Sequence, residues 1–491
     1  MPVSVTRKNV QFEPDASRVI SRFFYPSDSR ATDLIKRILA LPEKEQQEAL
    51  TQVLRDYSKR HRSISRIFEK HFGKLSRLLE QLGIDPHSLS IAQKGLIGAY
   101  FTMEYSIEAA AFFNPSIMQD PDQTGLAEGE TRVILSFRAT GEGHISSVVF
   151  RSGIIDSNND IQIEPPGKML ESPEQVKNHT YHKTSFLRKL EEMQTWNSNA
   201  YSIMGGKLTE TFTYEELKRY VEETRAVVSD DLQSQALLTE IMWLASSHYE
   251  MDFSVDTAIS ERVIFPIADT EMKGIEDARF VRFTGEDNEV TYYATYTAFD
   301  GITILPKLLM TKDFYHFKVM PVHGEVAQNK GMALFPRKIN GKFAMLCRID
   351  GVNNYIAFSD NINVWREASL LQTPVFPWEF VQMGNCGSPI ETSEGWLVIT
   401  HGVGAIREYV LGVSLLDLEN PARQIGRLSV PLLTPNAQER EGYVPNVVYS
   451  CGSMIHGENL VIPYAMSDYA STYATVNLEE LLGELKKSPV G

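Results

Sequence analysis

GIEDARFVRFTGEDNEVTYYATYTAFD, residues Gly274–Asp300, is the stretch that decides the fold. It predicts two strands joined by a polar turn. Ala278–Phe283 alternates small or apolar residues with charged ones, and Val290–Phe299 is rich in Tyr and Thr. Gly285–Asn288 supplies the turn between them. Such a unit buries its faces only against a neighbour, so its recurrence along the chain would define the architecture.

An acidic pair, Glu276-Asp277, stands near the entry of the first predicted strand and is followed by Arg279. A carboxylate beside an arginine at a strand entry can be held at a cleft with a controlled pKa. Taken alone, the pair is more simply interpreted as a solvated acidic turn. The recurrence of the strand–turn–strand unit favours the first interpretation.

Five polar turns lie between apolar, aromatic-rich runs, and Asn-Gly is the strongest short signal for a hairpin. They are Ala127–Glu130, Gly285–Asn288, Asn340-Gly341, Ser393–Gly395 and His456–Asn459. Sheet units at a period of roughly 50–60 residues are typical of a β-propeller, with an irregular β-sandwich as the alternative. We therefore predict a mainly β protein with a five-bladed β-propeller, an N-terminal helical region and a helical insertion.

The composition is that of a globular protein, and the charge is acidic. The 491 residues are 43% hydrophobic and 23% charged, with a formal charge of −15 and a pI near 5.3. This balance argues against a nucleic-acid partner, because phosphate backbones are bound by concentrated Lys and Arg. Any anion site must therefore be built locally from basic side chains.

The cysteines and the N-terminal residues indicate in which cellular compartment the protein is expected. Cys347, Cys386 and Cys451 are too few and too scattered for a disulfide framework or a zinc site. We find no apolar run of transmembrane length and no secretory signal at the N-terminus, so we expect a cytoplasmic protein without a membrane partner.

The order of the elements divides the chain into three parts. We expect an extended arm over residues 1–30, helices from Ala31 to about Gly83 and a further helix over Ala92–Phe113. A helical block at about 182–248 interrupts the strands, and a short helix covers Leu478–Leu485. The predicted domains are an arm and helical region (1–112), the propeller (113–477) and a C-terminal helix and tail (478–491). The N-terminal helices are a candidate for an oligomer contact, expected to make a homo-oligomer, or for a wall over a site in the propeller.

Charged residues at strand ends are the candidates for chemistry, because strand ends and loops line a propeller's funnel. Arg138 ends one apolar strand, and Lys330, Arg348 and His401 hold similar places in three other units, where they could converge on one anion. Each taken singly is more simply a surface cation or a hydrogen-bonded histidine. The sequence has no Gly-rich phosphate loop, HExxH or GxSxG motif, so nucleotide, zinc-protease and serine-hydrolase functions lack support.

At these residues the sequence resembles glycoside hydrolase family 130, the β-mannoside phosphorylases and related inverting β-mannosidases. The resemblance covers about residues 113–477 outside the helical block, and it implies a five-bladed propeller. The family usually has Asp-Pro-Arg where this chain has Asp277-Ala-Arg279. The other matching stretches are FNPSI (113–117), NKGMALFPRKINGKFAMLCR (329–348), SPIETSEGWLVITHGV (388–403), GVSLLDLENP (412–421), EGYVPNVVY (441–449) and PYAMSD (463–468).

The resemblance implies roles position by position. Asp277 would be the general acid, acting through a sugar hydroxyl, while phosphate attacks and inverts the anomeric carbon. Lys330, Arg348 and His401 match phosphate-binding positions, with Lys330 where an arginine is common. The substrate-binding candidates are Asn114, Arg138, Glu276, Arg279, Tyr296, Tyr443 and Asp468, the tyrosines as stacking faces that, like Trp396, are equally well explained as core aromatics.

One position departs from the family pattern. Gln382 stands where a lysine is often found, and hydrolytic members are those that lost basic residues here. The retained cations favour phosphorolysis of a β-mannoside, β-mannobiose or a β-mannooligosaccharide, to α-mannose 1-phosphate and a shortened sugar. The alternatives are an inverting β-mannosidase, with Glu391 or Glu441 as the base that activates water, and a non-catalytic sugar-binding propeller.

The expected partners are a β-mannoside oligosaccharide and inorganic phosphate as co-substrate, with no metal or organic cofactor. The glycosidic linkage, the acceptor sugar and the number of subunits stay open at this stage, because the acceptor-site loops cannot be placed in space from the sequence.

Overall fold

The computed structural model describes residues 3–175, 180–192, 205–228 and 231–487. The predicted central hairpin is confirmed: β13 (Gly274–Thr284) pairs antiparallel with β14 (Val290–Phe299) across the turn. The hairpin continues into β15 (Ile304–Thr311) and β16 (His316–Pro321) as a meander. The short strands β11 (Tyr249–Asp252) and β8 (Glu174–Gln175) extend its outer edge.

A second meander lies beside the first. It consists of β4 (Ala111–Gln119), β5 (Thr131–Thr140), β6 (Ser146–Ile155) and β7 (Ile161–Ile163), and β12 (Val263–Ile264) also pairs with β6. The two meanders meet through a single parallel pairing of Gly274 with Ser146. Gly274 has a φ of 139°, and a Cβ added there would lie 2.7 Å from Oγ of Ser146. Only glycine therefore permits this close approach.

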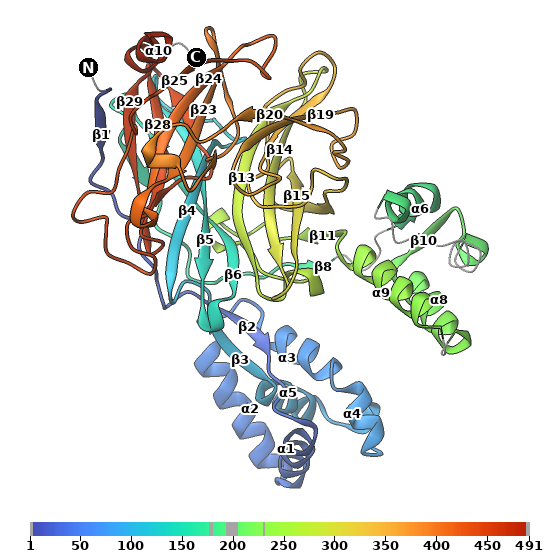
Figure 1. Ribbon diagram of the computed structural model, residues 1–491. Helices are drawn as coiled ribbons and strands as arrows, with labels where there is room; N and C mark the ends of the chain where they lie inside the picture. Colours follow the sequence, from blue (N-terminus) through green and yellow to red (C-terminus); the bar gives the residue numbers. More distant parts are fainter. Residues whose placement is uncertain (1–2, 176–179, 193–204, 229–230, 488–491) are drawn as a thin grey trace.

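Three larger antiparallel sheets follow along the chain (Figure 1). One contains β17 (Ala333–Leu334), β18 (Phe343–Cys347), β19 (Asn354–Ser359) and β20 (Ala368–Gln372). The next contains β21 (Gln382–Asn385), β22 (Ile390–Thr392), β23 (Gly395–Val403), β24 (Tyr409–Leu416) and β25 (Gln424–Arg427). The last contains β26 (Val448–Tyr449), β27 (Met454–His456), β28 (Asn459–Met466), β29 (Ala470–Asn477) and β1 (Val5–Arg7).

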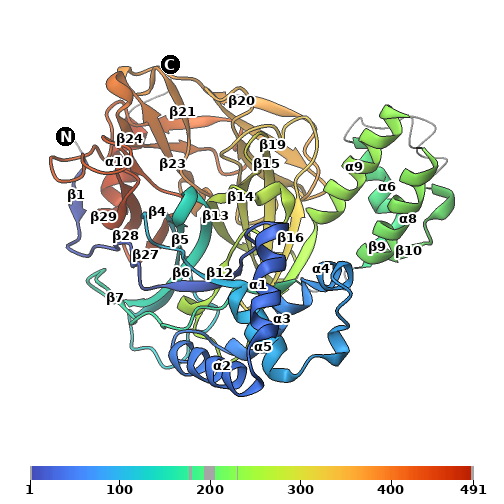
Figure 2. The same ribbon diagram turned by 90° about the horizontal axis from the view of Figure 1, so that it is seen from below.

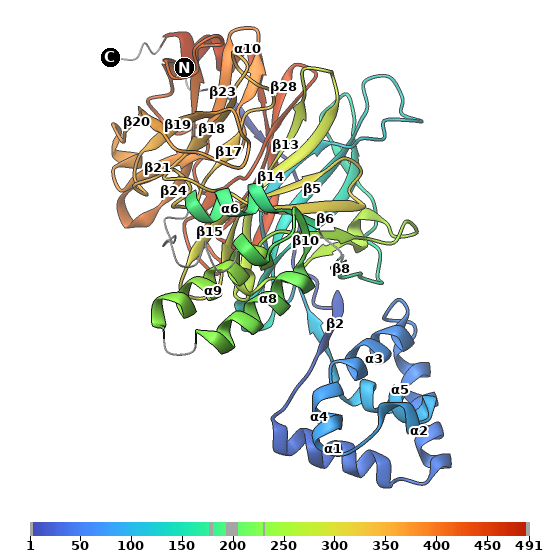
Figure 3. The same cartoon turned by 90° about the vertical axis from the view of Figure 1, so that its right-hand side faces the viewer.

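The mainly β prediction with added helices is confirmed. Each of the five predicted turns lies between two paired strands: β4–β5, β13–β14, β17–β18, β22–β23 and β27–β28. The extended arm is also confirmed in β1, which pairs with β29 and lies near the C-terminal helix (Figures 1 and 3). Within the described residues, backbone pairing does not join these sheets into one closed sheet.

The N-terminal helices pack around their own apolar core below the strands (Figures 1 and 2). They are α1 (Asp28–Ala40), α2 (Glu43–Tyr57), α3 (Ile64–Gly73), α4 (Ser76–Gln81) and α5 (Ile91–Tyr100). A two-stranded ribbon of β2 (Val19–Phe23) and β3 (Thr102–Ser106) links them to the β part.

The predicted helix over Ala92–Phe113 is wrong beyond Tyr100. A Ser90–Gln93 capping box begins α5, and Phe101 leaves the helical conformation, after which the chain enters β3 and β4. The residues after Phe101 (Thr102, Tyr105, Ile107) have β-branched or aromatic side chains, which fit a pleated surface. Long-range pairing with β2 and β5 thus overrides the weak local helical pattern.

The inserted helical block is confirmed in its described part. It holds α6 (Lys183–Glu192), α8 (Tyr214–Val227) and α9 (Leu232–Ser246), with the small hairpin β9 (Thr180–His182) and β10 (Thr211–Thr213). The predicted capping box is present, since Thr213 and Glu216 bond each other's backbone N–H groups. Residues 193–204 of the predicted block lie outside the described residues.

The chain ends in the predicted helix, α10 (Leu478–Lys487), which packs on β24, β25 and β29. No helix in the described ranges is long and apolar enough to cross a membrane.

A buried ion pair anchors the segment that leads into β13. Glu271 and Lys307 are both fully buried, 2.7 Å apart, and Glu271 also accepts hydrogen bonds from the hydroxyls of Tyr249 and Tyr296. Burial alone would raise the pKa of Glu271, but Lys307 and these hydrogen bonds lower it. The Glu271 carboxylate therefore joins the segment before β13 to β11, β14 and β15.

We expect Glu271→Ala to lower the free energy of unfolding by about 3–5 kcal/mol, because it leaves the buried Lys307 ammonium without its partner. Thermal unfolding followed by circular dichroism measures the loss. Glu289→Ala is the matched control, since its pair with Lys312 is exposed on both sides. Equal melting temperatures for the two variants would contradict a stabilising role for this cluster.

Candidate active site

The acidic pair sits in a β-bulge of β13. The register against β14 shifts between Glu276 and Arg279, and Asp277 adopts a left-handed backbone with a φ of 55°. Aspartate tolerates this conformation better than most residues, and bulges re-aim side chains next to sites. The bulge turns the Asp277 carboxylate away from its own strand face and towards β4 and β5.

A second bulge supplies the partner of Asp277. The register of β4 against β5 shifts between Phe113 and Ser116, and Asn114 has a φ of 50°. The Asn114 side chain is buried and donates from Nδ2 to Oδ1 of Asp277 at 2.6 Å. Its Oδ1 is buried without a hydrogen-bond partner, so Asn114 keeps one acceptor for a further donor.

Arg138 of β5 holds both carboxylates. Nη2 lies 2.7 Å from Glu276 and Nη1 lies 3.4 Å from Asp277. Burial by itself raises the pKa of Asp277, but the Arg138, Arg279 and Lys330 cations outweigh it and lower the pKa below its usual value. The Asp277 carboxyl is therefore ionised in the unliganded protein at neutral pH.

Asp468 lies at the same place from a third sheet. It follows β28 with a φ of 52°, and its side chain is half-buried. Burial and the neighbouring charges of Asp277 and Glu276 raise the pKa of Asp468 to about 7, against the opposing effect of Arg138. Two carboxyl groups in one site thus have pKa values pushed in opposite directions, which is the arrangement expected of acid–base chemistry.

The predicted anion-binding residues form two linked groups. Lys330, in the loop before β17, contacts Oε2 of Glu276 at 2.5 Å. Arg348, directly after β18, donates from Nη1 to Nε2 of His401 on β23 at 3.2 Å. Nε of Arg348 is buried without a partner, so the guanidinium has donor capacity left for a ligand.

Arg279 and Tyr449 connect the acidic group to the basic one. Arg279 donates from Nη1 to the backbone oxygen of Asp277 at 3.1 Å and from Nη2 to the Tyr449 hydroxyl at 2.7 Å. The Tyr449 ring lies 5.1 Å from the ring of His401, and the Asp277 and Arg279 charges both act on that imidazole. The structure therefore brings residues from β4, β5, β13, β23 and β26 and the loops beside them to one place.

Tyr296 does not join this cluster. On β14, Thr297 lies opposite Glu276 and Thr295 lies opposite Arg279. Tyr296 stands between these two threonines, so its side chain points to the other face of the sheet. Its ring is 3% exposed and its hydroxyl donates to Glu271. The prediction that its ring stacks on a substrate is contradicted, and the core alternative holds. Trp396 is likewise fully buried.

Tyr443 differs from Tyr296 because its side chain is 64% exposed. It lies in the loop before β26, where its hydroxyl is 3.5 Å from Nδ1 of His144 and the two rings are 5.5 Å apart. Val444 next to it donates to the backbone oxygen of Ser467, beside Asp468. Two exposed rings from separate loops thus border the cluster, a surface suited to a sugar face.

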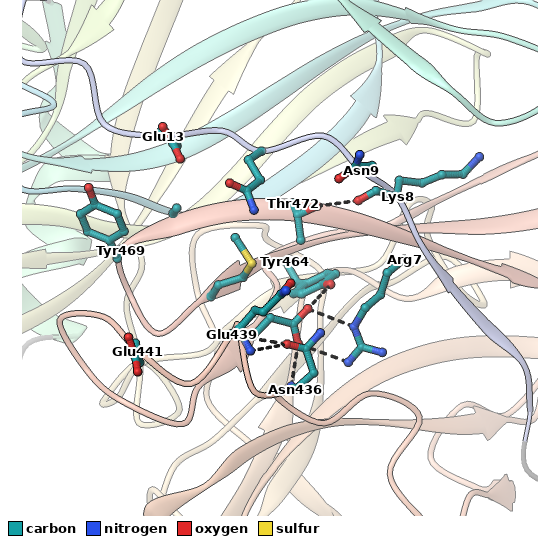
Figure 4. A pocket seen from close by; sticks show the side chains of 14 residues that line it. Arg7, Lys8, Asn9, Glu13, Asn436, Glu439, Glu441, Tyr464, Tyr469 and Thr472 are labelled. Atoms are coloured by element: carbon teal, nitrogen blue, oxygen red, sulfur yellow. Dashed lines mark hydrogen bonds and ion pairs between the residues drawn. The ribbon is translucent and has the colours of Figure 1, made fainter.

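The two carboxylates considered as a base for hydrolysis lie in different surroundings. Glu391, on β22, forms a two-point ion pair with Arg337 at 2.8 Å and is exposed. Glu441 lines a cavity of about 310 Å³ between the N-terminal arm and the loop before β26 (Figure 4). Met466 and Tyr469 line the same cavity from either side of Asp468 in the chain.

Sequence reasoning missed Tyr449, Tyr409 and Asn385. Tyr449 holds Arg279, the Tyr409 ring stacks on His401 at 6.1 Å, and the Asn385 carbonyl faces Nδ1 of His401. Tyr449 ends the matching stretch EGYVPNVVY, so the motif contained a signal for it. Among the described residues, no group of three His, Cys, Asp or Glu side chains is arranged to hold a metal ion.

Comparison with known families and proteins gives consistent findings. The pattern of the family described as beta-1,4-mannooligosaccharide phosphorylase, glycoside hydrolase family 130, matches residues 241–487. This range includes Asp277, Lys330, Arg348 and His401, whereas Asn114 and Arg138 lie before it.

Three relatives are similar over part of the chain. A 1,2-beta-oligomannan phosphorylase from Thermoanaerobacter sp. (strain X514) is 35% identical, covering 43% of this chain and 71% of that protein. A beta-1,2-mannobiose phosphorylase from Listeria innocua is 29% identical, covering 52% of this chain and 74% of that protein. A beta-1,4-mannooligosaccharide phosphorylase from Ruminococcus albus is 30% identical, covering 32% of this chain and 51% of that protein.

Proposed function

Because this chain belongs to glycoside hydrolase family 130, we propose that it cleaves a β-mannoside with inorganic phosphate and releases α-mannose 1-phosphate and a shortened sugar. It is a glycoside phosphorylase that acts on β-mannosides. The observation that carries the proposal is the link from Asp277 through Arg279 and Tyr449 to the His401 ring. A proton donor and an anion site at the two ends of that link are what phosphorolysis requires.

In the proposed mechanism Asp277 is the general acid and phosphate is the nucleophile. An inverting phosphorylase needs only one protein carboxylate, since phosphate replaces the water that a second carboxylate would activate. A bound phosphate anion beside Lys330 offsets one of the cations that lower the pKa of Asp277. Phosphate binding would therefore favour the protonated carboxyl that the acid role needs.

The substrate-binding roles follow from the geometry around Asp277. Asn114 has a buried acceptor without a partner, and Arg138 and Glu276 hold each other beside the acid. A mannosyl unit offers hydroxyl donors to Oδ1 of Asn114 and to Asp468. Tyr443 and His144 then border the sugar released from the anomeric carbon, because they are the exposed rings of the site.

We also propose that the two meanders and the three further sheets are the blades of a five-bladed propeller spanning residues 113–477, with the helical block at 182–248 inserted in it. The pairing of β1 with β29 supports this arrangement, because a strand from the N-terminal end completes the last sheet. A propeller buries each sheet only against its neighbours.

For the linkage, we propose β-1,2 as the first to test. Two of the relatives named above carry that linkage in their names, at 35% and 29% identity. The family description names β-1,4 instead. The acceptor loops determine this choice, and β-1,2- and β-1,4-mannobiose compared at equal concentration distinguish the two.

The test is a pair of incubations of β-mannobioses with the protein, one with phosphate and one without, assayed for mannose 1-phosphate and free mannose. Mannose 1-phosphate formed only with phosphate is the expected result. Equal release of free mannose in both would contradict it and favour the β-mannosidase alternative. No cleavage of any linkage would leave only the sugar-binding alternative.

The neutral residue Gln382 is the feature that favours the hydrolytic alternative. Its amide lies on β21 and donates to the Tyr409 hydroxyl at 3.2 Å, and Tyr409 stacks on His401. The neutral side chain thus stands beside the anion site and supplies no cation there, whereas a lysine would add one. Lys330 and Arg348 carry the charge that remains.

Asp468→Asn should move the alkaline limb of the pH–rate profile to lower pH by about one unit. Above about pH 7 Asp468 is ionised, and its negative charge favours the protonated form of Asp277. Removing that charge lowers the pKa of Asp277, so the acid form is lost at a lower pH. Asp468→Glu, which keeps the charge, is the control. An unmoved limb in the asparagine variant would exclude this electrostatic coupling.

A further inference from the structure

The hydrogen bonds of His401 fix which of its ring nitrogens carries the proton. Nε2 lies 3.2 Å from Nη1 of Arg348, and a guanidinium can only donate, so Nε2 presents a lone pair. Nδ1 lies 3.3 Å from the backbone oxygen of Asn385, which can only accept, so Nδ1 carries the hydrogen. His401 is therefore neutral, with its acceptor nitrogen directed at Arg348.

The surroundings hold the ring in this state. His401 is 2% exposed, and a Cβ added at Gly384 would lie 2.7 Å from its Cε1, so the ring is closely confined. The titratable and charged groups that face it are Arg348 after β18, Arg279 and Asp277 of β13, Cys386 after β21, Tyr409 of β24 and Tyr449 of β26. Burial and the two arginines lower the pKa of His401 well below its usual value, against the opposing effects of the Asn385 carbonyl and Asp277.

The other neutral tautomer is poorly supported by the site. With hydrogen on Nε2, the bare Nδ1 would face the Asn385 oxygen, lone pair against lone pair. The other contact of Nδ1 is the Cys386 thiol at 3.8 Å, a weak donor at long range. An anion that arrives beside Arg348 therefore meets an acceptor on His401.

We propose that this site takes up phosphate together with one proton, which is held between a phosphate oxygen and Nε2 of His401. On phosphate binding Arg348 moves its Nη1 hydrogen bond from Nε2 to another phosphate oxygen, which frees the single lone pair of Nε2. A phosphate oxygen that carries hydrogen then donates to Nε2, or the ring takes that hydrogen and donates it back. In both cases the complex contains one proton more than the phosphate dianion and the neutral ring. The inference rests on the proposed function, because it assigns the form in which the co-substrate binds.

The charge of the site fits a monoanion. Lys330 is already paired with Glu276, and the Arg279 charge faces the Asp277 carboxylate, although the buried Nε of Arg279, like that of Arg348, has no partner. Arg348 has its hydrogen bond to a neutral histidine and a partnerless buried Nε. Gln382 adds a polar but uncharged amide where a further cation would favour the dianion.

The test compares phosphate with sulfate on the full-length protein by titration calorimetry. Sulfate has the shape of phosphate but carries no proton near neutral pH. At about pH 8.5, measured in two buffers of different ionisation enthalpy, we expect about one proton taken up per phosphate bound, and almost none at about pH 6. Sulfate should bind at least about tenfold more weakly than phosphate.

His401→Gln separates the histidine from the rest of the site. Its amide can accept from Arg348 and donate to phosphate without titrating, so proton uptake and the preference over sulfate should both fall. His456→Gln is the matched control, since His456 is also buried but bonds Asn159 in the turn between β6 and β7. Uptake near zero in the unchanged protein at about pH 8.5, or equal affinity for the two anions, would overturn the inference. The proposed phosphorolysis would then still stand, whereas failure of phosphate to bind at all would contradict both.

Discussion

Asp277→Asn is expected to lower kcat for phosphorolysis of a β-mannobiose about a thousandfold. The asparagine can keep the hydrogen bond from Asn114 and the bulge conformation, but it has no acidic proton to deliver to the leaving sugar. Initial rates of mannose 1-phosphate release measure the effect. Phosphate binding should persist, because Arg348 and His401 are unchanged.

Two comparisons make this result specific to acid catalysis. An aryl β-mannoside with an acidic phenol as its leaving group needs little protonation, so the variant should lose far less activity on it. Asp300→Asn changes the aspartate directly after β14, whose carboxylate accepts hydrogen bonds from the backbone of Ile302 and Thr303, and should leave the rate unchanged. A D277N protein with more than about a tenth of the original rate on mannobiose would remove Asp277 from the acid role.

Local patterns predicted the β units well, because each hairpin signal is contained in a few residues. The alternation and turn residues of 274–300 correspond to β13 and β14, and Asn340-Gly341 lies between β17 and β18. The prediction of a helix beyond Tyr100 was wrong for the opposite reason. Its local pattern was ambiguous, and the pairing of β3 with β2, about 80 residues earlier, decided the conformation.

The site was predicted through the resemblance rather than through residue patterns. Asn114, Arg138 and Asp277 come from three strands, and nothing in their spacing shows that they meet. The left-handed bulges at Asn114 and Asp277 turn these side chains together, and a bulge depends on register across the sheet. Register also decides which face of the sheet the Tyr296 side chain occupies, because a shift of one residue moves a side chain to the opposite face.

Arg348→Lys is expected to raise the KM for phosphate about a hundredfold while leaving the KM for the mannoside nearly unchanged. A lysine keeps one charge but loses the planar fork, including the buried Nε that has no partner in the protein. It also loses the Nη1 donor that holds Nε2 of His401. Loss of charge-assisted hydrogen bonds of this kind costs about 1.5–3 kcal/mol, which corresponds to roughly ten- to a hundredfold in affinity. Steady-state kinetics with phosphate and mannoside varied separately measure the two constants.

The same reasoning predicts a change of opposite sign at Gln382. Gln382→Lys adds a cation next to Tyr409 and the His401 ring, so the KM for phosphate should fall. Arg337→Lys is the control for both variants, because this arginine pairs with the exposed Glu391 and its replacement should change neither constant. If R348K and R337K behaved alike, Arg348 would be structural and the anion site would lie elsewhere. A higher KM for phosphate in R348K together with a lower KM in Q382K would be explained by a single anion held between these side chains. No purely structural effect predicts changes of KM in both directions.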